Sequence, residues 1–441
     1  MLKFFSLFLL HGYLTNGHDV IPEYIPQTEG SSNSLPVSAF AYRESIARLS
    51  SRTDLLRRHR MHHDYIHEVT FVIKQRNMEQ LTEILRDVSN PMSINYGQHM
   101  TRKDISAMTS NLEAHTAVER YLYSIGATVI SDTLSSEYIQ ASASISVWEE
   151  MFDTTFFEYH QTHLNGDTGI FVRAEKYFIP TVLDCHVESV FNTIQMPYRL
   201  IGSLPQLVTK PVMTNLEEAV AEVSGTMTTP AKLKAFYNLG SAKGTSNSTQ
   251  CVYATINQFF SPADLNSFQN QNGLPIQPVV NSIGGYSSDS KCVKTPDSCA
   301  EGNLDVQYMM ATSPSSPTTF WYSDLDFSAW LVTVSGTPNP PLVISMSYGA
   351  EEATVSNSEL SAFNTEAIKL GAMGVTLVLA TGDDGAVSER VRVSGQSACS
   401  YEAIFPASCP YVVAVGGTAV SKTEQILLNC ENRVCYVANV L

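Results

Sequence analysis

The stretch "VTLVLATGDDGA" (residues 375–386) combines an uninterrupted apolar run with an acidic turn flanked by glycines. The run favours a strand buried on both faces, which is typical of a parallel sheet covered by helices. Similar runs occur in "PLVISMSYG" (341–349) and "YVVAVGGTA" (411–419), and the helical pattern "NSELSAFNTEAIKLGAMG" (357–374) lies between strands. This alternation predicts a doubly wound α/β region with helices on both faces of a parallel sheet.

Polar residues follow these runs where the expected strands end. Asp383 lies in the turn "TGDDGA" (381–386), and "SYG" (347–349) ends another strand. In an open parallel sheet, ligands bind outside the carboxyl ends of the strands. Asp383 is therefore a candidate site residue. The alternative is a polar turn that caps the next element.

Two further acidic residues lie in "SCAEGNLDVQYMMAT" (298–312), which has the pattern of a helix. Glu301 and Asp305 are four residues apart, and this spacing places both carboxylates on one helical face. Like charges so placed repel each other, by about a few tenths of a kcal/mol on an exposed surface and by more when buried. Either the pair is the solvated start of a helix, or a function retains it.

The composition narrows the possible functions. The chain has 441 residues, of which 44% are hydrophobic and 16% charged, and its formal net charge is −16. This acidity argues against nucleic acid as the main partner. All eleven histidines lie at or before His186. If the functional site lies in residues 187–441, it contains no histidine. Ser-His-Asp catalysis, Cys-His catalysis and a His-ligated zinc site are then excluded.

The N-terminus indicates the secretory pathway. Residues 1–17 contain one lysine, an apolar run from Phe4 to Leu10 and small residues after it, which together predict a cleaved signal peptide. No later run is long and apolar enough to predict a membrane-spanning helix. We therefore expect a lysosomal or extracellular protein.

The cysteines and one glycosylation sequon agree with that expectation. Eight cysteines fit an oxidising compartment. Cys292 and Cys299 are close enough in sequence to pair, as are Cys430 and Cys435, although spacing does not decide the connectivity. Asn247 begins the sequon Asn-Ser-Thr and is a candidate glycosylation site on a surface loop.

Residues 65–175 show a different pattern, in which helices alternate with antiparallel strands. Strands are expected at 67–75, 127–133, 136–144, 154–162 and 169–175, and helices at 77–90, 111–126 and 145–152. This order suggests a small ferredoxin-like α+β sandwich. The basic, histidine-rich segment before it (44–67) is expected to form a solvated helix or linker, with a pH-responsive contact as the alternative.

Three motifs of the C-terminal half resemble those of the sedolisin, or serine-carboxyl peptidase, family. In that family a helix carries E-x-x-x-D, which Glu301 and Asp305 match. Residues 381–386 are similar to the family's S-G-D-S-G-A turn, with Asp384 where the family usually has serine. Residues 405–418 match F-P-A-S-x-P-Y-V-x-x-V-G-G-T.

Two further motifs extend the resemblance over most of residues 65–418. "TPAKLKAFYNL" (229–239) resembles the start of the family's catalytic domain, and "SNPMSINYGQHMTRKDI" (89–105) resembles the motif of its propeptide. The resemblance implies a ferredoxin-like α+β propeptide domain followed by an α/β subtilisin-like catalytic domain. The implied boundaries are a signal peptide (1–17), a pro-kumamolisin-like activation propeptide (65–195), a linker (196–226) and a partial catalytic domain (227–441).

The resemblance also implies a role for each acidic residue. Glu301 would take the proton of the nucleophile, and Asp305 would share a hydrogen bond with it, so that the pair titrates as a unit. Sharing a proton turns the repulsion between the two groups into attraction. Asp383 would donate a hydrogen bond to the oxyanion, which requires a protonated carboxyl and therefore favours acid pH.

The implied function is an acid peptidase proenzyme that hydrolyses peptide bonds, with exo- and endopeptidase action both open. Its partners would be peptide or protein substrates and its own propeptide, docked on the catalytic domain. The family's nucleophilic serine lies in an S-G-T-S motif after V-G-G-T, and this motif does not occur in the sequence. We therefore expect a chain that is truncated before the nucleophile and inactive as written.

The family's calcium site follows the same serine and would lie beyond Leu441, so no cofactor is expected within the 441 residues. The alternative function is a non-catalytic, propeptide-like binder or inhibitor of related peptidases. An unrelated dinucleotide-binding enzyme is disfavoured, because no G-x-G-x-x-G follows a strand and opens a helix.

Overall fold

The computed structural model describes residues 39–46, 52, 54–132, 136–162, 168–198, 201–202, 228–383, 402–416, 429–431 and 434–436. The expected signal peptide (1–17) and most of the expected linker (196–226) lie outside these residues. The described parts of Ala39–Leu441 belong to one unit, within which we distinguish an N-terminal region (39–202) and a C-terminal region (228–416).

The C-terminal region is built on a six-stranded sheet with the order β12-β13-β11-β14-β16-β18. Every pairing in this sheet is parallel, as the apolar runs predict. Its strands are β11 (Gln250–Ala254), β12 (Asn281–Ile283), β13 (Thr318–Tyr322), β14 (Val343–Met346), β16 (Thr376–Ala380) and β18 (Val413–Val415). Because both β11 and β13 are buried at every residue, neither strand shows a polar face in its sequence.

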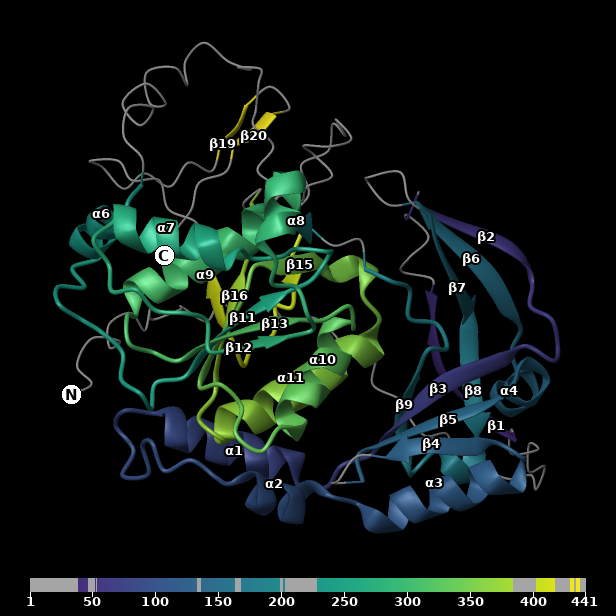
Figure 1. The fold of residues 1–441 in the computed structure, drawn as a ribbon. Coiled ribbons are helices and arrows are strands. Elements are labelled where there is room, and N and C mark those ends of the chain that lie inside the picture. Colours follow the sequence, from purple (N-terminus) through teal and green to yellow (C-terminus); the bar gives the residue numbers. More distant parts are fainter. Residues whose placement is uncertain are drawn as a thin grey trace. The chain divides into compact units, whose positions relative to one another are not determined.

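Helices cover both faces of this sheet (Figure 1). They are α6 (Pro230–Phe236), α7 (Pro262–Gln271), α8 (Asp289–Lys294), α9 (Ala300–Thr312), α10 (Phe327–Gly336) and α11 (Asn357–Ala372). Trp330 of α10 and Phe363 of α11 join the hydrophobic cluster on one face. Val306 of α9 joins the cluster on the other face, with Phe320 of β13. The predicted doubly wound parallel sheet is therefore confirmed.

Local signals explain where these helices begin. Ser356 caps α11, because its hydroxyl accepts a hydrogen bond from the Glu359 backbone N–H while the Glu359 carboxylate accepts one from the Ser356 N–H. Thr229 caps α6 in the same position, and Pro230 takes the first helical turn. Within the described residues, 3-10 turns also occur at η2 (Thr181–Leu183), η3 (Pro296–Cys299) and η4 (Glu352–Thr354).

Two small antiparallel sheets extend the C-terminal half. The first has the order β10-β15-β17, with β10 (Ile201–Gly202), β15 (Tyr348–Glu351) and β17 (Ile404–Phe405). The second pairs β19 (Asn429–Glu431) with β20 (Val434–Tyr436) and sets Cys430 opposite Cys435 in the register. A disulfide between these two cysteines stays a prediction.

The N-terminal region contains antiparallel sheets and four helices. Its main sheet has the order β4-β5-β3-β9 and antiparallel pairings throughout. The strands are β1 (Phe40–Ser45), β2 (Leu55–Arg60), β3 (Ile66–Ile73), β4 (Thr128–Asp132), β5 (Tyr138–Ser144), β6 (Phe156–Thr162), β7 (Thr168–Ala174), β8 (Lys176–Pro180) and β9 (Val187–Phe191). The helices are α1 (Met78–Ser89), α2 (Arg102–Thr109), α3 (Leu112–Ser124) and α4 (Ile145–Phe152). The name ferredoxin-like stays a prediction.

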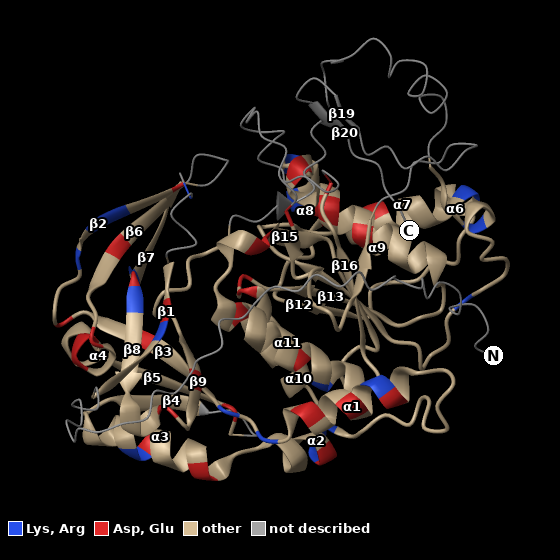
Figure 2. Ribbon diagram, turned by 180° about the vertical axis from the view of Figure 1, so that it is seen from behind, with Lys and Arg blue, Asp and Glu red and all other residues tan. Residues whose placement is uncertain are grey.

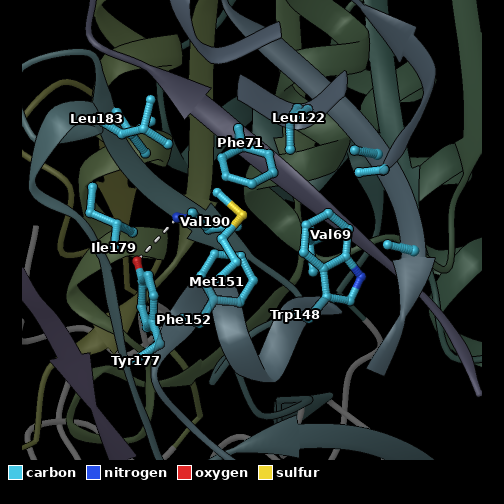
Figure 3. Close-up of a cluster of buried hydrophobic side chains, with 14 of the residues drawn as sticks. Val69, Phe71, Leu122, Trp148, Met151, Phe152, Tyr177, Ile179, Leu183 and Val190 are labelled. Atoms are coloured by element: carbon cyan, nitrogen blue, oxygen red, sulfur yellow. Dashed lines mark hydrogen bonds between the residues drawn. The ribbon is translucent and has the colours of Figure 1, made fainter. Parts of the chain in front are cut away.

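The core of the N-terminal region is aromatic (Figure 3). Trp148 and Phe152 of α4 stack with ring centroids 5.6 Å apart, and Phe71 of β3 lies 6.2 Å from Trp148. The hydroxyl of Tyr177 accepts a hydrogen bond of 3.0 Å from the Val190 backbone N–H, which satisfies the one polar atom of that ring.

The basic segment is a strand, so the expected helix or linker is wrong for residues 55–60. β2 pairs with β6, and its arginines reach carboxylates on other elements: Arg57 pairs with Glu175, and Arg60 with Glu149. Figure 2 shows this basic edge in blue. Pairing with a neighbouring strand has overridden the local preference of a charged segment.

His67, the last residue of the histidine-rich segment, is not a pH sensor in the expected range. Its ring is buried and bonds to the backbone carbonyl of Asn192 at 2.8 Å. Burial lowers the pKa of His67 to about 4. The imidazole therefore stays neutral until the pH is well below that of an ordinary histidine.

A buried ionic cluster joins the two regions of the unit. Lys369 of α11 is 3% exposed, and its Nζ lies 2.6 Å from Glu137 Oε1 and 2.9 Å from Glu366 Oε1. Tyr138 of β5 donates a hydrogen bond to the same Glu366 oxygen, and Ser335 of α10 donates to the other. One cation thus satisfies carboxylates from both regions.

Lys369→Met should destabilise the fold, because it leaves two buried carboxylates without their cation. We expect a loss of about 3–5 kcal/mol at neutral pH and a smaller loss at acid pH, where the carboxyls become neutral. Urea unfolding at both pH values measures this. Lys294→Met, which removes an exposed lysine of α8, is the control. Equal midpoints for the two variants would contradict the role of the cluster.

Candidate functional site

The start of α9 is fixed by three contacts that position Glu301. A disulfide joins Cys299, the residue before the helix, to Cys292, which is one of the pairings that the sequence left open. The side chain of Gln258 accepts a hydrogen bond of 3.2 Å from the Glu301 backbone N–H. At Gly302, a Cβ atom would lie 2.3 Å from the carbonyl oxygen of Phe259, so only glycine permits this close approach.

The structure brings all three predicted acidic residues to one cavity of about 170 Å³. Glu301 and Asp305 reach it from α9, and Asp383 reaches it from the turn that follows β16. The other lining residues are Leu304, Ser347, Tyr348, Gly349, Ala380, Gly382 and Ile404. The cavity lies at the carboxyl ends of β14 and β16, where an open parallel sheet binds its ligands.

Asp305 is held in an environment that favours its neutral form. Its Oδ1 accepts a hydrogen bond of 2.9 Å from the Ser347 hydroxyl. Its Oδ2 is buried and has no hydrogen-bond partner among the described residues. Burial, and then the charge of Glu301, raise the pKa of Asp305 to about 8, although the Ser347 hydrogen bond acts to lower it.

The second carboxyl of the pair is also withdrawn from solvent. Glu301 is 5% exposed. Two ionised carboxylates four residues apart on a helix, both largely removed from water, would repel strongly. Since Asp305 retains its proton at neutral and acid pH, the pair avoids carrying two negative charges.

Asp383 occupies the exposed rim of the cavity. The turn before it is fixed by Thr381, whose backbone N–H donates a hydrogen bond of 3.0 Å to the Val415 carbonyl at the end of β18. Gly382 then adopts a φ of +88°, which an L side chain rarely takes. Gly382 and Asp383 both line the cavity. Asp384 lies outside the described residues.

Asn247, the predicted glycosylation site, lies on the surface. It is exposed in a turn, where its backbone N–H donates a hydrogen bond to the Thr245 hydroxyl. The sequon therefore lies on an accessible surface.

The sequence analysis did not assign a role to two residues that line the cavity. Ser347 and Tyr348 belong to "SMSYG", which the sequence placed at a strand end without assigning a role to either side chain. Tyr348 is buried, and its hydroxyl has no hydrogen-bond partner among the described residues.

Among the residues that the structure describes, no group of three or more His, Cys, Asp or Glu residues is arranged to hold a metal ion. No described helix is long and apolar enough to cross a membrane.

Comparisons with known proteins show what the chain is similar to. Residues 53–196 match the family model of the pro-kumamolisin activation domain. The chain is 29% identical over 369 residues to tripeptidyl-peptidase 1 of Homo sapiens, a match that covers 80% of this chain and 61% of that protein. The match to tripeptidyl-peptidase 1 of Mus musculus is 30% identical over 367 residues, with the same coverages of 80% and 61%.

The chain thus spans about 61% of the length of the curated relatives it matches. Among solved structures, Pseudomonas sedolisin, a serine-carboxyl proteinase complexed with two molecules of pseudo-iodotyrostatin, is similar at 24% identity and a TM-score of 0.35. That similarity covers 44% of this chain and 55% of the sedolisin chain. The resemblance to the sedolisin, or serine-carboxyl peptidase, family is confirmed. The chain is similar to tripeptidyl-peptidase 1 over 80% of its own length.

The raised pKa of Asp305 predicts that the free energy of unfolding falls as the pH rises. In the unfolded chain this carboxyl loses its proton near its ordinary value of 3.8, whereas in the folded chain it keeps the proton until about pH 8. Between these values the folded state binds more protons, so stability decreases with pH by up to about 1.4 kcal/mol per unit. Asp305→Asn should flatten this slope in urea titrations.

Asp289→Asn is the control for this measurement. The pKa of Asp289 is lowered, by hydrogen bonds from Ala263 and Ser261, so its carboxyl is ionised in both states above about pH 5. Its removal should leave the slope at higher pH unchanged. A slope that Asp305→Asn does not alter would show that Asp305 ionises normally.

Proposed function

We propose that this protein is the proenzyme of an acid serine-carboxyl peptidase that hydrolyses peptide bonds. The observation that carries the proposal is the cavity that receives Glu301, Asp305 and Asp383 together. The motif matches that led to these residues come from different parts of the sequence, and the fold need not have united them. The similarity to tripeptidyl-peptidase 1 supports the release of tripeptides from free N-termini as the specific reaction.

In this proposal Glu301 is the general base. Its carboxylate takes the hydroxyl proton of the nucleophilic serine and later gives it to the leaving amine. Asp305 donates a hydrogen bond to Glu301 and titrates with it as a unit. The serine attacks the substrate carbonyl, the peptide C–N bond breaks, and water then hydrolyses the acyl-enzyme. No residue of the 441 is assigned as the nucleophile.

Asp383 would supply the oxyanion hole. A carboxyl can donate a hydrogen bond to a developing oxyanion only while it is protonated, and an acid medium favours that form. The absence of histidine after residue 186 fits a site in which carboxyls perform all proton transfers. Together these features support an acidic compartment, lysosomal or extracellular, reached by a signal peptide over residues 1–17.

Residues 65–195 would be the activation propeptide. The family match to residues 53–196 and the Lys369 cluster, which joins this segment to α11, support its docking on the partial catalytic domain at 227–441. The linker at 196–226 would be cleaved on activation. If the protein is instead a non-catalytic binder, it should inhibit related peptidases and show no turnover of its own.

Glu301→Gln and Asp383→Ala should each lower kcat by about 10²–10³-fold, because they remove the base and the oxyanion donor. The assay uses a form of the protein that includes the nucleophilic serine, after acid treatment, with fluorogenic tripeptide amides that have free or blocked N-termini. Asp297→Asn, which alters an exposed acid next to α9, should retain activity. Cleavage of blocked substrates alone would indicate an endopeptidase. Full activity of both variants would contradict the assigned roles.

Asn247→Gln should remove one N-linked glycan from the secreted protein. Asn247 is exposed, so a glycan at this position meets no steric obstacle from its own turn. Endoglycosidase treatment followed by electrophoresis compares the wild type with the variant. An unchanged mobility difference would show that the sequon is not used.

A further inference from the structure

We propose that Ser347 is a positioning residue that fixes the Asp305 proton on Oδ2, the buried oxygen to which the Ser347 hydroxyl does not donate. This role rests on the proposed function, in which Asp305 donates a hydrogen bond to Glu301. Ser347 itself would touch neither the substrate nor the nucleophile. It would act through Asp305 alone.

The backbone holds Ser347 as the single residue between two paired strands. Before it, Met346 of β14 pairs in parallel with Tyr253 and Leu379. After it, Tyr348 of β15 pairs with Gly202 in the antiparallel direction. A residue fixed on both sides has little freedom to move its side chain away from Asp305. The hydroxyl is therefore a rigid donor in the sense that preorganised sites require.

The hydrogen-bond partners of the two Asp305 oxygens indicate which oxygen carries the proton. The Ser347 hydroxyl donates to Oδ1 at 2.9 Å, and Oδ1 is its only acceptor among the described residues. If the proton were on Oδ1, the hydroxyl would have to accept it and would lose its own acceptor there. The buried Oδ2 would then also lack a donor within the described part of the chain.

The opposite arrangement leaves fewer polar groups unsatisfied. With the proton on Oδ2, the hydroxyl keeps its acceptor on Oδ1 and Oδ2 becomes a donor. Glu301 is the neighbouring acid whose charge acts on Asp305, and both carboxyls lie on the same face of α9 and line the same cavity. Buried polar groups without partners are costly, so this arrangement is favoured.

Two other charged or titratable groups bear on the test. Tyr348 lines the cavity beside Ser347, and burial, followed by the charges of Asp305 and Glu301, raises the pKa of its hydroxyl. Asp383 lies on the rim. A change measured at Asp305 itself separates the effect of Ser347 from titration of these neighbours.

Ser347→Ala should raise the pKa of Asp305 by about one unit, because a hydrogen bond to the ionised form is lost. The measurement is a pH titration of ¹³C-labelled aspartate carboxyls by NMR in the full protein, with Asp305→Asn identifying the resonance. Ser347→Thr keeps the hydroxyl and should leave the pKa unchanged. Ser347→Cys, a weaker donor of similar size, should give an intermediate shift and serves if the alanine variant does not fold.

Ser345→Ala is the matched control, since this serine lies two residues earlier and makes no hydrogen bond to either carboxyl in the described structure. An unchanged Asp305 pKa in Ser347→Ala, or an equal shift in Ser345→Ala, would overturn the proposal. The titration decides this whether or not the protein cleaves peptides. If it does, Ser347→Ala should lower kcat roughly tenfold with little change in KM, and Ser347→Thr should restore it.

Discussion

The constraint on which this site depends is the cost of burying two carboxyls four residues apart on one helix. Water no longer stabilises their charges, and burial together with the charge of Glu301 raises the pKa of Asp305. Among the described residues, no cation pairs with Asp305. Its carboxyl instead accepts a hydrogen bond from the Ser347 hydroxyl, and its raised pKa keeps it protonated at neutral pH. A pair arranged in this way keeps one ionised group that can act as a base and one neutral group that can donate.

Such a pair needs a rigid frame, and the parallel sheet supplies it. Hydrophobic clusters on both faces fix the strands, so the ends of β14 and β16 stay at set positions beneath α9. The disulfide at Cys299 and the close approach at Gly302 fix the helix start independently. The carboxyls therefore lie on elements that the core already orders, and only Asp383 lies on a turn. This division suits a base that must hold its geometry and a rim residue that meets the substrate.

The sequence predicted the parts of this fold whose signals are local. The apolar runs of β14 and β16 and the helical pattern of α11 identify those elements without tertiary information. The sequence did not identify α7, α10 or β13, because those segments carry mixed patterns that only the surrounding sheet organises. It also placed β2 wrongly, since pairing with β6 and ion pairs to Glu149 and Glu175 outweigh the preference of a charged segment.

The same distinction applies to the site. Glu301, Asp305 and Asp383 were recognisable because their motifs have fixed spacings. Ser347 was not recognisable, because no sequence pattern assigns a role to a single serine at a strand end. Its role becomes visible only when the structure shows which atom its hydroxyl contacts. Its strand and the helix of Asp305 are distant in sequence, and the 2.9 Å contact is a property of the packed fold. Residues that act through another residue are thus the part of a site that sequence patterns describe least well.

The protein compensates the negative charge of buried carboxylates in two ways. The difference decides which of the two sites changes its charge with pH. At Lys369 a permanent cation compensates Glu137 and Glu366, and that lysine stays charged at every physiological pH because its pKa is raised. At Asp305 the compensation is a proton, which the solvent can remove. The first arrangement serves as a joint between the two regions of the unit. Only the second changes its charge near neutrality, so the carboxyl pair, and not the joint, gains a negative charge as the pH rises toward 8.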